Sequence, residues 1–222
     1  MNPEAGGGGR EADATRRPTP LRLGVLFSGG GRTLENLARS IENGSLPARI
    51  EIAISSHAGA GGIEKARAYG VPCLTIDYRE HREDFSEAIA RALDEARVEL
   101  VALAGFIRHY RYPPRQEGRI LNIHPALLPA FGGKGFYGHR VHEAVLRSGA
   151  KFSGCTVHFV THEYDSGPII LQRIVPVLPG DTPDSLAARV FAEECVAYPE
   201  AIRLYAEGRL EVREGRVRIK DA

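Results

Sequence analysis

The chain has 222 residues, of which 43% are hydrophobic and 26% charged, which is typical of a globular protein with a substantial buried core. Its 29 basic and 28 acidic residues leave a net charge of +1, which gives no electrostatic basis for binding nucleic acid or a membrane surface. The three cysteines are scattered and form no C-x-x-C pair. The sequence also has no apolar run long enough to span a bilayer and no signal-peptide core, so we predict a cytoplasmic protein.

Residues 1–20 are rich in glycine, proline and charged residues and contain almost no large apolar side chains. Such a segment cannot bury enough surface to offset the entropy lost on ordering, so we expect a disordered N-terminal tail. From residue 21 onward, apolar runs are separated by polar, glycine-containing turns. We therefore expect residues 21–222 to form a single domain.

Between residues 21 and 124, short apolar runs alternate with segments of helical periodicity. This alternation predicts a parallel sheet, and right-handed crossovers then place helices on both of its faces. Strands are expected at residues 21–27, 49–56, 72–76, 99–105 and 118–124, and helices at residues 34–44, 61–70 and 81–98.

The pattern changes in the C-terminal part of the chain. A helix is predicted over residues 139–149, followed by two long antiparallel strands within residues 152–177 that flank the turn Tyr-Asp-Ser-Gly. A long helix over residues 181–208, capped by Asp181 or Thr182, precedes a hairpin that turns at Glu214 and Gly215. The expected fold class is α/β, Rossmann-like and doubly wound, with a mostly parallel sheet and an antiparallel C-terminal strand pair.

The turn Ser-Gly-Gly-Gly-Arg-Thr at residues 28–33 joins the first strand to the first helix. Its glycines let backbone N–H groups approach an anion, and the helix N-terminus adds a favourable dipole. No Lys-Ser/Thr follows, so the turn is not a P-loop, and without the third glycine of the dinucleotide fingerprint NAD is a poor match. A phosphate-binding loop and a merely tight turn fit this stretch equally well.

Asn122 and His124 follow an apolar run, two residues apart, at a predicted strand end, where open parallel sheets bind ligands. An asparagine amide and a protonated imidazole can both donate to an oxygen that gains negative charge. The alternative is a histidine that only satisfies a backbone carbonyl. The pairing at a strand end favours the catalytic interpretation.

Asp165 lies in the turn between the two antiparallel strands, where aspartate before Ser-Gly is ordinary turn chemistry. It becomes functional if the turn folds against His124, because the carboxylate could then hold the ring charged and pass a proton.

The spacings of His139 with His142 and of His158 with His162 suggest metal ligands, but nothing completes either set, so we expect no metal. Ser28 lacks the strained elbow of a hydrolase nucleophile.

Two motifs carry a family resemblance: Asn-Ile-His-Pro-Ala-Leu-Leu-Pro-Ala-Phe from Asn122, and Thr-Val-His-Phe-Val-Thr-His-Glu-Tyr-Asp-Ser-Gly-Pro from Thr156. At this separation the chain resembles the folate-dependent formyltransferases over residues 21 to about 208, most closely the members that act on glycinamide ribonucleotide. The resemblance implies the formyltransferase fold. It also implies transfer of the formyl group of 10-formyltetrahydrofolate to the amine of 5-phosphoribosylglycinamide, in de novo purine biosynthesis.

The resemblance also implies residue roles. Asn122 and protonated His124 would stabilise the oxyanion, and Asp165 would support the charged ring and proton transfer. The ribonucleotide would be bound by Gly30, Gly31, Arg32, Thr33 and Glu194. The folate pocket would be formed by Arg82, Ile107, Arg108, His109, Tyr110, Asn122, Thr161, His162, Glu163, Tyr164 and Asp165. Many relatives have Asn and Ser where this chain has Gly30 and Arg32, and residues 132–140 are longer than in the simple form of the loop.

Other members of this superfamily offer alternative functions. Formyltetrahydrofolate deformylases usually carry an N-terminal regulatory domain and a second histidine where this chain has Pro125. Methionyl-tRNA formyltransferases have a further, basic C-terminal domain, and formyltransferases of amino sugar nucleotides are more distant. A non-catalytic binding module would be expected to lack the trio. The expected partners are the two small substrates, without nucleic acid or membrane, bound by a monomer or homodimer.

Overall fold

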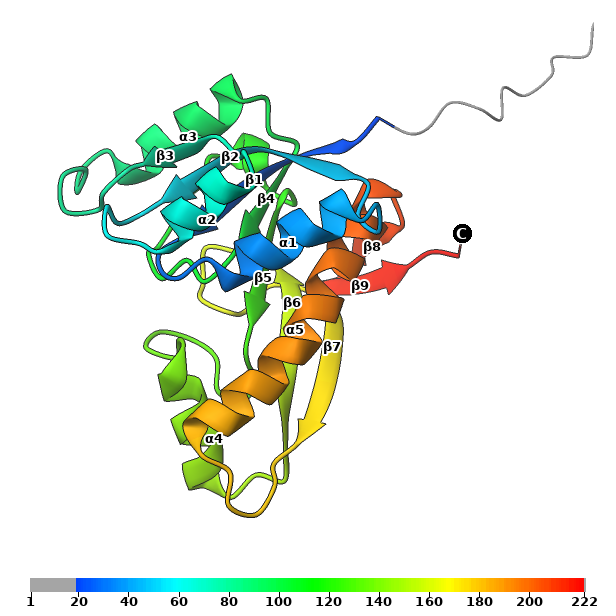
Figure 1. Cartoon of the computed structure of the whole chain (residues 1–222). Helices are drawn as coiled ribbons and strands as arrows, with labels where there is room; N and C mark the ends of the chain where they lie inside the picture. Colours follow the sequence, from blue (N-terminus) through cyan, green and yellow to red (C-terminus); the bar gives the residue numbers. More distant parts are fainter. Residues whose placement is uncertain (1–18, 222) are drawn as a thin grey trace, which may run out of the picture.

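The computed structural model describes residues 19–221, so the predicted tail lies almost entirely outside the described residues. The described part is built on a seven-stranded sheet with strand order β3-β2-β1-β4-β5-β6-β7 (Figure 1). The strands are β1 Leu21–Phe27, β2 Ala48–Ser55, β3 Cys73–Thr75, β4 Leu100–Leu103, β5 Ile120–His124, β6 Phe152–Phe159 and β7 Ile169–Pro176. The helices are α1 Arg32–Glu42, α2 Gly62–Ala68, α3 Phe85–Glu95, the 3-10 turn η1 Pro114–Gln116, α4 His139–Ser148 and α5 Pro183–Ala206.

The direction of the strands agrees with the prediction from the sequence. Strands β1 to β5 pair in parallel, whereas β6 pairs antiparallel with both β5 and β7. A small separate hairpin, β8 Leu210–Arg213 and β9 Arg216–Ile219, follows α5. The apolar run of β1 is explained by its central place in the sheet, since a strand covered on both faces has no polar side.

Helices cover both faces of the sheet, as expected from right-handed crossovers. One apolar cluster joins one face to α3 through fully or almost fully buried Phe85, Ile89 and Leu93. The larger cluster joins the other face to α1, α2, α4 and α5, and Figure 1 shows α1 and α5 on this side. No described helix combines the length and apolar character that crossing a bilayer requires.

Helix α5 begins at the cap predicted from the sequence and contains a proline. Of the two candidate caps, Thr182 is the N-cap, and its side chain and that of Ser185 form a reciprocal capping box. Pro199 lies inside the helix and has no N–H to donate to the carbonyl of Cys195, four residues earlier. Asn36 of α1 donates its Nδ2–H to that carbonyl at 3.0 Å, which ties α1 to α5.

We predict that Asn36→Ala lowers the free energy of unfolding by about 1–2 kcal/mol, because the Cys195 carbonyl loses its partner within a packed interface. Urea denaturation measures the change. Glu42→Ala, at an exposed position of the same helix, serves as control and should change stability by less than about 0.5 kcal/mol. Equal effects of the two substitutions would contradict this role of Asn36.

Tyr198 fixes α5 against two neighbouring strands of the sheet. The side chain is fully buried, and its hydroxyl lies 3.0 Å from the Leu103 carbonyl and 2.9 Å from the Leu121 carbonyl. Glu194 is four residues earlier, on the same face of the helix. The contact of Tyr198 with β4 and β5 therefore places Glu194 near the carboxyl ends of these strands.

Candidate active site

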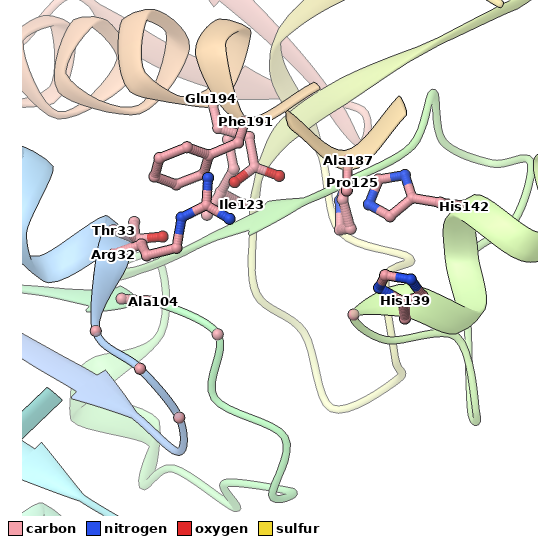
Figure 2. Close-up of a pocket in the computed structure, with 15 residues that line it drawn as sticks. Arg32, Thr33, Ala104, Ile123, Pro125, His139, His142, Ala187, Phe191 and Glu194 are labelled. Carbon is pink, nitrogen blue, oxygen red and sulfur yellow. The ribbon is translucent and has the colours of Figure 1, made fainter. Parts of the chain in front are cut away.

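The candidate site lies at the carboxyl ends of β1, β4 and β5. The chain runs from β1 outward to β2 and β3 and then returns to place β4 on the other side of β1. Loops that leave neighbouring strands in opposite directions open a crevice at such a switch point. One cavity of about 390 Å³ occupies this position (Figure 2). A second, of about 80 Å³, borders the end of β5 and the connection between β6 and β7.

Asn122, His124 and Asp165 come together in the structure, as proposed from the sequence. Asp165 Oδ2 lies 3.6 Å from His124 Nδ1, and Asp165 Oδ1 accepts from Asn122 Nδ2 at 3.4 Å. The turn that carries Asp165 therefore folds against the end of β5. This contact favours a functional aspartate over one that only shapes the turn.

A backbone N–H group and two imidazole rings surround the carboxylate of Asp165. Its Oδ2 accepts from the Gly133 N–H at 2.8 Å, and His158 Nε2 lies 3.7 Å from Oδ1. Burial alone would raise the pKa of Asp165, but the neighbouring His158, His124 and Gly133 N–H together hold it below its ordinary value. The group is therefore ionised at neutral pH and can stabilise a positive charge beside it.

His124 is almost completely buried beside Asp165. The ring is 4% exposed, and its Nε2–H donates to the Phe131 carbonyl at 2.8 Å. Burial lowers the pKa of His124 below its ordinary value, although Asp165 and the Phe131 carbonyl act in the opposite direction. Desolvation thus outweighs the carboxylate in the ligand-free protein and favours the neutral ring, and a protonated His124 during the reaction stays a prediction.

His158 is a further member of this cluster, which the sequence analysis considered only as a possible metal ligand. It lies opposite Asn122 in the β5–β6 ladder and is 2% exposed. Its Nδ1–H donates to the Phe159 carbonyl at 2.8 Å, so Nε2 is free to accept from Asn122 Nδ2 at 3.1 Å. His158 thus orients the Asn122 amide. The available signal was an imidazole within an otherwise apolar, buried strand.

The glycine turn after β1 forms one wall of the larger cavity. Gly31 has φ of 69°, and a Cβ there would lie 2.5 Å from the Cα of Gly62, so the turn requires glycine. The Gly62 N–H donates to the Gly29 carbonyl at 3.0 Å and braces the turn against α2. No side chain caps the start of α1, so its first N–H groups are available to an anion.

Arg32 and Glu194 both line this cavity, and Figure 2 shows their charged groups near each other, beside Phe191. The Arg32 guanidinium stacks over the Phe191 ring, 3.7 Å from its centroid. Burial raises the pKa of Glu194 to about 7, against the opposing effect of the Arg32 charge. All of the residues assigned to the ribonucleotide by resemblance line this one cavity: Gly30, Gly31, Arg32, Thr33 and Glu194.

Most residues assigned to the folate line two cavities that share Arg108, His109 and Tyr164. The 80 Å³ cavity is lined by Arg108, His109, Tyr110, Asn122, Thr161, Glu163, Tyr164 and Asp165, among others. A neighbouring cavity of about 520 Å³ includes Arg82, Ile107, Arg108, His109 and Tyr164.

His162 is the exception to this grouping. Its ring stacks on Tyr112, with the two centroids 4.4 Å apart, and it lines neither of the two cavities. Its contribution is its carbonyl, which accepts from His109 Nε2 at 3.1 Å. A role of His162 in folate binding stays a prediction, and in this structure its ring is held by the stacking on Tyr112.

The pairs of histidines do not assemble into a metal centre. Within residues 19–221, no group of three or more His, Cys, Asp or Glu side chains is placed to hold a metal ion. His139 Nε2 instead lies 3.3 Å from Asp184 Oδ1, and His158 belongs to the cluster around Asn122. The described site thus combines a loop suited to an anion with amide, imidazole and carboxylate groups suited to an addition at a carbonyl carbon.

Comparison with known proteins agrees with this arrangement. The formyl transferase family model matches residues 21–202. The trifunctional purine biosynthetic protein adenosine-3 of Gallus gallus is 42% identical over 87% of this chain, which spans only 19% of that protein. The chloroplastic phosphoribosylglycinamide formyltransferase of Arabidopsis thaliana is 39% identical over 90% of this chain and 70% of that protein.

A solved structure shows the same agreement in three dimensions. The glycinamide ribonucleotide transformylase 1 of Symbiobacterium toebii is 44% identical, with a TM-score of 0.87 over 96% of this chain and 100% of that one. The fold expected from the sequence is confirmed, including the antiparallel strands at the C-terminal side of the sheet. The chain therefore belongs to the formyl transferase family.

Proposed function

We propose that this chain transfers the formyl group of 10-formyltetrahydrofolate to the amine of 5-phosphoribosylglycinamide, in de novo purine biosynthesis. The observation that carries the proposal is the position of β5 between two kinds of cavity. Ile123 and Pro125 line the cavity with the glycine turn, and Asn122 lines the cavity on the folate side. A phosphorylated acceptor on one side and a folate donor on the other would meet at Asn122, His124 and Asp165.

In the proposed reaction the acceptor amine attacks the formyl carbon, and a new C–N bond forms while the carbonyl oxygen becomes an oxyanion. The Asn122 amide, oriented by His158, and the imidazole of His124 stabilise this oxygen once the N–H groups that donate here to Asp165 Oδ1 and to the Phe131 carbonyl turn toward it. The developing negative charge favours protonation of His124, and the ionised Asp165 at 3.6 Å stabilises the resulting imidazolium.

Collapse of the intermediate breaks the bond between the formyl carbon and the folate nitrogen. A proton must leave the attacking amine and reach this leaving nitrogen. Asp165 and His124 provide an acceptor and a donor for that transfer, directly or through a water molecule. The step needs no redox partner, and the residues at the site supply all of the acid–base groups.

Two cavity features support small substrates of these kinds. The uncapped start of α1 and the glycine turn suit the phosphate of the acceptor, with Arg32 beside them. On the other side, Arg82, Arg108 and Arg111 line the 520 Å³ cavity and suit the carboxylates of a folate. We expect the protein to act in the cytoplasm as a monomer or homodimer, although two plant relatives have chloroplastic forms.

Hydrolysis of the formyl donor is the main rival reaction. Deformylation requires only water as acceptor, whereas this chain has a cavity of about 390 Å³ with an anion-binding loop beside the catalytic cluster. The experiment follows folate absorbance in the presence and absence of 5-phosphoribosylglycinamide. Turnover that depends on the ribonucleotide supports the proposal. Equal turnover in its absence would identify a deformylase.

Glu194 provides a prediction that separates stability from binding. The pKa of its carboxyl in the folded protein is about 7, above the ordinary 4.5. The protonated carboxyl therefore makes its full contribution to stability below about pH 4.5, and the contribution is lost as the group ionises with rising pH through 7. Glu194→Gln should therefore melt at a higher temperature than the wild type at pH 8 and at nearly the same temperature at pH 4.5.

The same Glu194→Gln variant should bind the ribonucleotide more weakly. Its KM for 5-phosphoribosylglycinamide should rise roughly tenfold at pH 8, because ribose hydroxyls would lose a charged acceptor. Thermal melts at the two pH values and steady-state kinetics measure the two effects. A stability gain that is the same at both pH values, or an unchanged KM, would contradict the assignment.

A further inference from the structure

His142 is a buried histidine of α4 that the proposed reaction does not use. Its side chain is 5% exposed and lines the 390 Å³ cavity together with Gly138 and His139. Figure 2 shows the ring reaching from α4 toward Pro125 and Ala187. Pro125 directly follows His124, so the ring lies beside the part of the cavity that adjoins the catalytic cluster.

The hydrogen bonding of His142 differs from that of the other buried histidines. In the described part of the chain, His124 and His158 each bond a backbone carbonyl, at 2.8 Å in both cases. His142 Nδ1 is buried without a hydrogen-bond partner among the residues that the structure describes. A buried imidazole nitrogen without a hydrogen-bond partner raises the free energy of the folded protein, and an apolar side chain could fill the same space without that cost. The missing protein partner therefore indicates that a ligand supplies the hydrogen bond.

The charge state of His142 limits the ligand groups that it can recognise. Burial lowers the pKa of His142 to about 4, and the charges of His139 and His124 act in the same direction. The ring is therefore neutral at physiological pH, with one nitrogen as donor and the other as acceptor. Such a ring suits an uncharged amide or hydroxyl group and is a poor partner for the phosphate.

We infer that His142 binds the uncharged middle of the acceptor ribonucleotide, its amide or ribose hydroxyl groups, between the phosphate at residues 29–33 and the amine at the catalytic cluster. This inference rests on the proposed function, since it assigns a residue to the acceptor. The contact would hold the amine in line with the formyl carbon and would reject phosphorylated compounds without a hydrogen-bonding group at this place. His142 is thus a specificity-determining residue on the acceptor side.

Four proteins test the inference: the wild type, His142→Leu, His142→Asn and the control Val145→Ala. Leucine fills the space without a polar atom, and asparagine places an amide near the position of Nδ1, the nitrogen without a protein partner. Val145 is fully buried on the same helix, so its truncation loosens α4 without removing a polar group. The measurements are KM for each substrate, kcat, and the Kd of 5-phosphoribosylglycinamide alone by calorimetry.

His142→Leu should raise KM and Kd for the ribonucleotide roughly tenfold, with KM for the folate unchanged, and His142→Asn should recover at least part of the loss. Val145→Ala should lower the melting temperature and leave both constants unchanged. Wild-type affinity in His142→Leu, no recovery with asparagine, or an equal loss in Val145→Ala would overturn the inference. If the wild type binds the ribonucleotide without formylating it, the proposed function fails, while the calorimetric comparison still decides the role of His142.

Discussion

Asp165→Asn should keep the fold and lower kcat by roughly a hundredfold or more, the scale on which general acid–base groups act. The asparagine amide carries no charge, so it cannot stabilise an imidazolium at His124, whose Nδ1 lies 3.6 Å away. It also presents one donor where the carboxylate accepts from the Gly133 N–H and from Asn122. Steady-state kinetics, with a thermal melt of the same sample, give both quantities.

Asp181→Asn provides a matched control for this experiment. Asp181 accepts from Arg189 at 2.9 Å and from the Leu178 N–H at 2.7 Å, outside the catalytic cluster. These bonds hold the pKa of Asp181 well below its ordinary value of 3.8. The Asp181→Asn variant should therefore be less stable than the wild type at neutral pH, and the difference should disappear as the pH falls below about 4. Its kcat should stay normal. An Asp165→Asn variant with near-normal kcat would remove Asp165 from the mechanism.

His124→Gln should lower kcat by roughly a hundredfold to a thousandfold, comparable to the removal of an oxyanion donor, with little change in either KM. Glutamine can still donate to the Phe131 carbonyl, which His124 Nε2 contacts at 2.8 Å, so the local packing is kept. The double variant with Asp165→Asn tests whether the two side chains act together. Its loss should be much smaller than the product of the single losses, because Asp165 acts mainly through the ring.

Fully multiplicative losses in the double variant would show that Asp165 and His124 act independently. That outcome would contradict the proposed pair and would favour a separate role for Asp165, for example through Asn122, which it contacts at 3.4 Å. The measurement is a complete cycle of four proteins at one pH, with both substrates saturating.

The elements of the fold could be predicted because their signals are local. The apolar run of β1, the Thr182 cap and the turn at Glu214 each lie within a few residues of the element that they define. The family and its fold were predicted from two motifs that the structure places on neighbouring strands, β5 and β6. The residues alone did not decide whether Asp165 shapes a turn or serves a site.

The site depended on contacts that local patterns do not contain. The pairing of Asn122 with His158 follows from the register of β5 against β6, which is set across 36 residues of chain. The lowered pKa of His124 results from its burial by surrounding elements. The position of the His162 ring results from its packing on Tyr112. Each is a tertiary effect, so no local pattern of residues contains it.

The central claim is that the acceptor of the formyl group is 5-phosphoribosylglycinamide. The most direct measurement supplies 10-formyltetrahydrofolate with an isotopically labelled formyl carbon, together with the ribonucleotide, and follows the label by mass spectrometry. The account predicts that the label appears in the ribonucleotide as one added formyl group, and that Asp165→Asn slows its appearance. Release of the label as formate, at a rate that the ribonucleotide does not change, would contradict the account.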